Sequence, residues 1–219
     1  MDGSKLRGLT LSMLLLLPTY RACADDRPPR IPAPTVPAID SVWDNPKALV
    51  TSMFGPASPR LVALDSDLDE DGKVDWAGIV EWDGDDALIA QLFVLMRQAD
   101  GSYKLTEISK STDTYRSGVE GMEPESHGFQ VTYTNSCGAN CLSGSDLHFK
   151  LYKGQWRLVG RDDRGYYTEP DKETRESYNY LTGREVDEVM AKNGKVASSV
   201  VKRTDDKAIL LRETGPLGP

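Results

Sequence analysis

The segment from Asp67 to Asp75 has the residue types and spacing of a calcium-binding loop. Counted from Asp67, carboxylates stand at positions 1, 3, 5 and 9 and a glycine stands at position 6. Calcium takes six to eight oxygen ligands at about 2.3–2.6 Å, and alternate side chains of such a loop can point at one centre while the glycine permits a sharp turn. We therefore predict a calcium site formed by Asp67, Asp69, Asp71, Asp75 and the backbone carbonyl of Lys73.

This loop differs from an EF-hand. Position 12, where an EF-hand has a bidentate glutamate, is Gly78, and the flanking sequence lacks paired helices. The shorter loop type between β-strands fits better, with Asp75 closing the coordination and Glu81 as a candidate further ligand. A structural calcium is our main interpretation, because five aspartates from Asp65 to Asp75 would repel one another with only Lys73 opposing them. A solvated acidic turn without an ion and a catalytic metal are the alternatives.

The two histidines, His127 and His148, do not indicate catalysis. His148 lies between Leu147 and Phe149 on a predicted strand and should face away from them, and His127 precedes a glycine in a turn. Neither lies near a nucleophile motif such as G-x-S-x-G. Glycoside hydrolysis requires two carboxyl groups at a fixed distance from each other, and that distance is set by the fold. The number of acidic residues in the sequence therefore neither supports nor excludes this reaction. We predict a protein that acts by binding and is not an enzyme.

The first 24 residues have the layout of a secretory signal peptide. A basic start precedes an apolar run of about nine residues from Leu9 to Leu17, and an A-x-A cleavage site ends at Ala24. The apolar run is too short for a bilayer, which needs ~20 residues. A lipobox would instead make Cys23 an acylated anchor, but Tyr20 and Arg21 do not fit that pattern. We predict cleavage after residue 24 and a periplasmic protein without a membrane span.

The two remaining cysteines, Cys137 and Cys141, are separated by three residues. In an exported chain this spacing favours a disulfide over a metal or catalytic site, because no nearby histidine or second cysteine pair completes a zinc set. Chain-entropy arithmetic for so short a ring gives only ~2 kcal/mol. The predicted disulfide would shape one loop and would not hold the fold together.

The chain is acidic, with 34 Asp and Glu against 26 Lys and Arg and a net charge of −8. The first 24 residues carry three basic residues and one acidic residue, so residues 25–219 have a net charge of −10. This balance excludes nucleic acid and anionic membranes as expected partners, since both require basic surface that displaces counterions. A basic protein is the partner that such a surface favours.

Short strands joined by tight turns dominate the sequence after Leu61. Apolar residues alternate with polar ones over 129–133, 147–151 and 156–160, which predicts a three-stranded antiparallel meander. Asn45 as a cap and Pro46 at the first helical position allow one short helix within 45–54. The predicted fold class is all-β, a small antiparallel meander with at most one short helix near the N-terminus.

The composition divides the chain into four parts. After the signal peptide at 1–24, a proline-rich N-terminal arm covers 25–44 and a single β-domain covers 45–203. The remaining residues, 204–219, are predicted to form a flexible C-terminal tail with a free end from Thr214.

Residues 64–75, LDSDLDEDGKVD, with Ile79 and Val80 after them, resemble the calcium loop of FG-GAP or VCBS-type β-propeller blades. The later strand segments, such as 149–160 and 179–183, follow in an order similar to a group of bacterial periplasmic proteins with a small propeller-like β-domain. The resemblance covers roughly residues 61–202. It implies that the domain at 45–203 is an incomplete β-propeller-like unit around the calcium loop 67–75.

Some members of that group are immunity proteins that inhibit peptidoglycan-degrading, lysozyme-like toxins. The resemblance implies that this chain binds and inhibits such a hydrolase, and lysozyme-like enzymes are often basic, so opposite charge would raise the association rate. The segment with Cys137 and Cys141 departs from the commoner members, so the partner would differ if that loop contacts it. The alternative is a calcium-stabilised structural or adhesive exported module without an enzyme partner, and an enzyme acting on polysaccharide ranks third.

Overall fold

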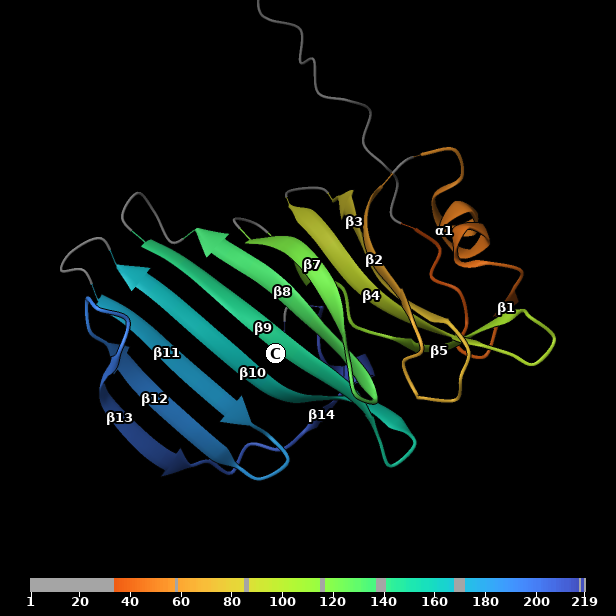
Figure 1. The fold of residues 1–219 in the computed structure, drawn as a ribbon. Helices are drawn as coiled ribbons and strands as arrows, with labels where there is room; N and C mark the ends of the chain where they lie inside the picture. Colours follow the sequence, from red (N-terminus) through yellow and green to blue (C-terminus); the bar gives the residue numbers. More distant parts are fainter. Residues whose placement is uncertain are drawn as a thin grey trace, which may run out of the picture.

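The computed structural model describes residues 34–57, 59–84, 87–114, 117–136, 141–167, 172–216 and 218. These residues form two antiparallel β-sheets, one α-helix and one 3-10 helix (Figure 1). The prediction of an all-β antiparallel meander with one short helix near the N-terminus is confirmed. The predicted signal peptide lies outside the described residues, as do residues 25–33 of the proline-rich arm.

The first sheet has the strand order β1-β5-β4-β3-β2, with β6 paired to β4. Each of its strands is antiparallel to its neighbours. The strands are β1 (Val42–Trp43), β2 (Arg60–Ser66), β3 (Asp75–Asp83), β4 (Leu88–Arg97), β5 (Tyr103–Ile108) and β6 (Thr112–Asp113).

The second sheet is a meander of seven consecutive strands from β7 to β13, with β14 paired to β10. The three strands that the sequence predicts lie within β8, β9 and β10. The strands are β7 (Ser117–Glu125), β8 (Gly128–Ser136), β9 (Cys141–Tyr152), β10 (Gln155–Tyr167), β11 (Lys172–Asn179), β12 (Arg184–Met190), β13 (Val196–Arg203) and β14 (Ile209–Leu210).

One apolar core lies between the two sheets. Ile79 and Leu92 of the first sheet pack in the same buried cluster as Phe129, Leu147 and Phe149 of the second. The rings of Phe129 and Phe149 stack with their centroids 5.4 Å apart. Because every second residue of these strands points into the core, the alternate residues of the second sheet are left on its opposite, outer face.

Helix α1 (Pro46–Phe54) covers the other face of the first sheet (Figure 1). Its cap is the predicted one, since the Asn45 side chain accepts a hydrogen bond from the Ala48 amide at 2.9 Å and Pro46 is the first helical residue. Phe54 packs against Trp82 with a centroid distance of 5.6 Å. Within the part of the chain that the structure describes, no helix combines the length and the apolar composition that crossing a membrane requires.

The C-terminal segment is docked, so the predicted flexible tail is wrong for residues 209–216. β14 pairs with β10, and Leu211, at the start of a 3-10 helix (Leu211–Glu213), is fully buried in the core between the sheets. The Lys110 amide donates to the Thr214 carbonyl at 2.9 Å. A two-residue strand and one turn of helix are too short to show a hydrophobic period, and their stability comes from contacts with residues far away in sequence.

Replacing Leu211 by alanine should therefore destabilise the protein by about 2–5 kcal/mol, the cost of a cavity in a packed core. Urea denaturation of the wild type and of Leu211→Ala measures this difference. Leu181→Ala is the control, because Leu181 is 44% exposed and its truncation should change the free energy of unfolding by less than about 0.5 kcal/mol. Equal effects of the two substitutions would contradict a docked C-terminal segment.

Candidate functional site

The loop between β2 and β3 brings three of the predicted calcium ligands together. One carboxylate oxygen from each of Asp67, Asp69 and Asp71 lies within 4.8 Å of the others. Two oxygens that share a calcium ion at about 2.5 Å can be up to about 5 Å apart. These three hard oxygen donors therefore fit one calcium-sized cation, and we call them the carboxylate cluster.

Backbone amides of the same loop hold the carboxylate cluster in place. Asp67 accepts hydrogen bonds from the amides of Asp71 at 3.0 Å and Gly72 at 2.9 Å, and Asp69 accepts one from Asp71 at 3.1 Å. Gly72 has a φ of +87°, a conformation that side chains other than glycine rarely adopt. Gly72 therefore permits the sharp turn of the loop, which is the role that its position in the motif predicts.

Asp75, the predicted ligand at position 9, has a different set of contacts. It is 1% exposed, and its two oxygens accept hydrogen bonds from the amides of Leu68 at 3.0 Å and Arg97 at 2.8 Å. Burial raises the pKa of Asp75 to about 6, while the two amide bonds act in the opposite direction. In this structure Asp75 fastens the loop to the end of β4, and its oxygens are not part of the carboxylate cluster.

The Lys73 side chain forms an ion pair with Asp71 at the surface of the loop. This side-chain bond lowers the pKa of Asp71 and raises the pKa of Lys73. The Lys73 amide also donates to Asp71 at 2.9 Å. The ammonium of Lys73 thus supplies a positive charge beside the cluster, in addition to the backbone carbonyl that the motif assigns to this position.

Glu81, the candidate further ligand, lies away from the loop. Its side chain is buried in β3 and accepts a hydrogen bond from Arg60 at 2.7 Å. The same guanidinium donates to the Val119 carbonyl of β7 at 2.6 Å. Arg60 and Glu81 therefore fasten the edge of the first sheet to the edge of the second, where β2 and β7 run beside each other.

Two residues between the aspartates anchor the loop, and the motif alone did not identify them. Leu68 is fully buried in the core between the sheets. Glu70 accepts a hydrogen bond from the Ser126 hydroxyl at 2.8 Å and lies 3.2 Å from His127 Nε2, both in the turn between β7 and β8. A single leucine within an acidic segment was the one signal that could have indicated such anchoring.

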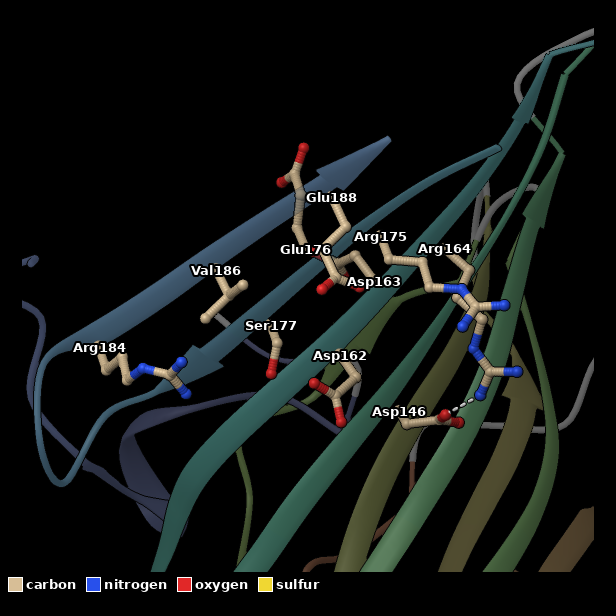
Figure 2. A pocket seen from close by; sticks show the side chains of 10 residues that line it. All are labelled: Asp146, Asp162, Asp163, Arg164, Arg175, Glu176, Ser177, Arg184, Val186 and Glu188. Atoms are coloured by element: carbon tan, nitrogen blue, oxygen red, sulfur yellow. Dashed lines mark hydrogen bonds and ion pairs between the residues drawn. The ribbon is translucent and has the colours of Figure 1, made fainter. Parts of the chain in front are cut away.

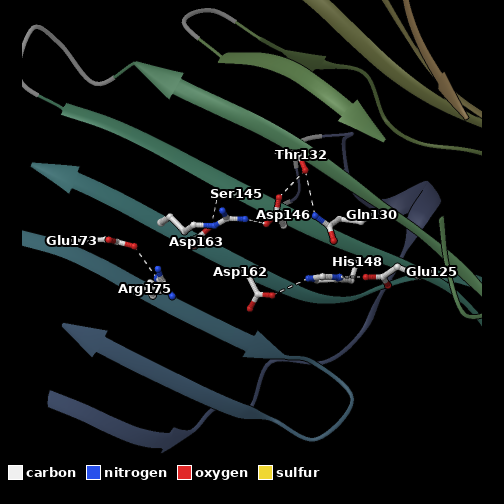
Figure 3. A network of polar contacts seen from close by, with 11 residues as sticks. Glu125, Gln130, Thr132, Ser145, Asp146, His148, Asp162, Asp163, Glu173 and Arg175 are labelled. Atoms are coloured by element: carbon white, nitrogen blue, oxygen red, sulfur yellow. Dashed lines mark hydrogen bonds and ion pairs between the residues drawn. The ribbon is translucent and has the colours of Figure 1, made fainter. Parts of the chain in front are cut away.

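His148 lies on the outer face of the second sheet between two carboxylates (Figure 3). Its Nδ1 is 2.7 Å from Glu125 and its Nε2 is 3.0 Å from Asp162. The bond to Asp162, followed by the bond to Glu125, raises the pKa of His148 although desolvation opposes it. An imidazole that donates from both nitrogens is protonated and has no lone pair with which to take a proton. The two carboxylates therefore favour the protonated form of His148, which donates from both nitrogens.

Further charged residues line a cleft of about 500 Å³ beside this histidine (Figure 2). Asp146 accepts a hydrogen bond from Thr132 at 2.7 Å and forms an ion pair with Arg164, and Arg175 pairs with Glu173 at 2.8 Å. The sequence did not indicate this cleft, because each charge alone resembles an ordinary solvated position on the polar side of a strand. The lining residues are Asp146, Asp162, Asp163, Arg164, Arg175, Glu176, Ser177, Arg184, Val186 and Glu188.

The predicted disulfide stays a prediction. Cys137 lies outside the described residues, and Cys141 is the first residue of β9, opposite Tyr167 of β10.

The His148 ion pairs predict a pH-dependent stability. The pKa of His148 is raised in the folded state, so its stabilising effect is fully present below the unfolded pKa of about 6.5 and is lost as the pH rises through the folded pKa. His148→Asn should therefore lower the free energy of unfolding more at pH 6 than at pH 9. Urea denaturation of both proteins at the two pH values measures this, and a difference that does not change with pH would contradict the ion pairs.

Comparison of the chain with protein-family models, with curated proteins and with solved structures finds no match in any of the three. The carboxylate cluster and the charged cleft are therefore interpreted from their own geometry and chemistry.

Proposed function

We propose that the chain is a periplasmic calcium-binding β-protein that binds and inhibits a basic peptidoglycan hydrolase. The observation that carries the proposal is the convergence of three carboxylates, Asp67, Asp69 and Asp71, in a loop with calcium-motif spacing. The loop resemblance to a group that includes immunity proteins, and the acidic net charge of −8, support the choice of partner.

The ion would be held by the carboxylate cluster, with the Lys73 carbonyl as the further ligand that the motif assigns, while Asp75 would hold the loop in place through the amides of Leu68 and Arg97. A divalent cation neutralises closely spaced negative charges. The loop reaches both sheets through Leu68 and Glu70, so ordering it would also stabilise the contact between the sheets. Calcium in this role is structural and leaves recognition to the protein surface.

Binding, in preference to catalysis, is supported by the state of His148. Both of its ring nitrogens contact carboxylates, which favours the protonated ring, and a protonated ring has no lone pair that could accept a proton. The cleft beside it is lined by five acidic side chains and three arginines. A surface of this kind recognises a protein through complementary charge, which raises the association rate with a basic partner.

Calcium should raise the melting temperature of the protein, and a chelator should reverse the effect. At a calcium concentration 100 times the Kd, binding to the folded state alone adds about 2.7 kcal/mol to its stability. Asp67→Asn and Asp69→Asn should each reduce the calcium-dependent shift, because each removes one charged ligand. Differential scanning calorimetry with calcium or chelator measures these shifts.

Asp100→Asn is the matched control, since Asp100 is exposed in the turn between β4 and β5 and its carboxylate accepts bonds from Ser102. This variant loses the same charge but should keep the full calcium shift. Identical melting temperatures of the wild type with calcium and with chelator would show that the loop is an acidic turn without an ion.

Inhibition is tested by mixing the purified protein with lysozyme-type hydrolases in a wall-lysis assay, including a hydrolase encoded next to its gene. We expect stoichiometric inhibition of one such enzyme and a slower association at higher salt, because screening weakens attraction between opposite charges. If no neighbour-encoded hydrolase is inhibited, the proposed partner is wrong. A calcium shift without inhibition would instead favour the structural or adhesive module.

A further inference from the structure

The two faces of the β12–β13 ribbon, at the free edge of the second sheet, differ in how their charges are matched (Figure 1). On one face Lys202 of β13 pairs with Glu185 at 3.2 Å and Asp187 at 2.5 Å, both on β12. On the other face Arg184 of β12 stands directly opposite Arg203 of β13. Like charges in directly opposed positions destabilise a sheet, so this face has an arrangement that folding alone does not favour.

The residues on this second face form three consecutive rows of different chemistry. The Arg184–Arg203 row is cationic, the next row along the strands pairs Val186 with Val201, and the third pairs Glu188 with Ser199. We call these six residues the β12–β13 strip. Figure 2 shows that Arg184, Val186 and Glu188 follow one another along the cleft of about 500 Å³, which all three line.

The groups of the strip are available to a ligand. Arg184 and Arg203 are exposed, and Val201 is 60% exposed, so all three can contact a ligand. Throughout the described ranges of the chain, the side chains of Arg184, Arg203 and Glu188 have no ion pair. The strip thus offers two unpaired guanidinium groups at one end and an unpaired carboxylate at the other.

We propose that the β12–β13 strip binds a short extended peptide with a free carboxylate at one end and a free ammonium at the other. Two guanidinium groups side by side suit a carboxylate, which takes two parallel hydrogen bonds. Glu188 and the Ser199 hydroxyl accept hydrogen bonds from an ammonium group. The valine row between them contacts an apolar side chain.

The spacing of the rows sets the length of the ligand. Arg184 and Glu188 are four residues apart on one strand, which corresponds to about 13 Å. An extended peptide spans about 3.3–3.6 Å per residue, so four residues match the distance between the charged rows. The ligand is therefore a tetrapeptide with free termini. This site goes beyond the proposed inhibition of a hydrolase and depends on neither calcium nor that partner.

Isothermal titration calorimetry with tetra-alanine tests the proposal. Four forms of the peptide are compared: both termini free, the N-terminus acetylated, the C-terminus amidated, and both termini blocked. We expect the free peptide to bind, each blocked terminus to weaken binding about tenfold, and the doubly blocked peptide to bind least, because each blocking group removes a charge that the strip contacts. A segment inside a partner protein has no free termini, so equal affinity of all four forms would overturn the proposal in favour of a protein strand at this edge.

Variants assign each end of the peptide to its row. In Arg184→Gln and in Arg203→Gln, amidating the C-terminus should weaken binding less than it does in the wild type, because only one guanidinium remains to contact the carboxylate, whereas acetylating the N-terminus should weaken binding as before. In Glu188→Gln the pattern should be reversed. Lys202→Gln is the control, since it removes a positive charge from the same strand but from the opposite face, and its affinities should match the wild type.

All of these substitutions are at the exposed edge of the sheet, and circular dichroism melting confirms that each variant is folded before titration. Absence of binding of the free tetrapeptide at millimolar concentration, or equal losses in Lys202→Gln and Arg184→Gln, would overturn the proposal. Hydrolase inhibition is measured separately, so its failure would not affect this result.

Discussion

Burial of apolar side chains between the two sheets is the interaction on which the rest of the structure depends. Phe129, Leu147 and Phe149 of the second sheet meet Ile79 and Leu92 of the first in one core. Two segments outside the long strands are also anchored in this core. Leu68 anchors the acidic loop, and Leu211 anchors the C-terminal segment. Polar contacts such as the Arg60 bridge from Glu81 to Val119 reinforce the contact at the edge of the sheets.

Electrostatic repulsion opposes that packing at the acidic loop. Three carboxylates of one short loop converge, and the backbone amides of Asp71 and Gly72 together with the Lys73 ammonium offset part of their repulsion. A calcium ion would offset more of it, since a divalent charge among hard oxygen donors is what this spacing suits. The loop is attached to both sheets, so its charge state and the stability of the whole β-structure are linked.

The outer face of the second sheet follows a different principle. Because side chains alternate along a strand, charged residues of neighbouring strands meet on this face and form ion pairs. His148, for example, lies between Glu125 and Asp162. Matching is incomplete at the free edge, where Arg184 and Arg203 oppose each other. Paired charges contribute to stability, whereas the unpaired charges are the ones that can recognise a ligand.

The sequence by itself determined what depends on short-range pattern: the all-β class, the Asn45 and Pro46 helix start, the alternation in β8 to β10, and the glycine turn among the aspartates at 67, 69 and 71. Tertiary structure decided what depends on residues far apart. It turned Asp75 toward the amides of Leu68 and Arg97, buried Glu81 against Arg60, and docked the segment around Leu211. It also gathered charges of β9 to β12 into one cleft. Local periodicity specifies which side of a strand a residue occupies, but strand order and register specify which distant residue it meets, and neither can be inferred from spacing along the chain.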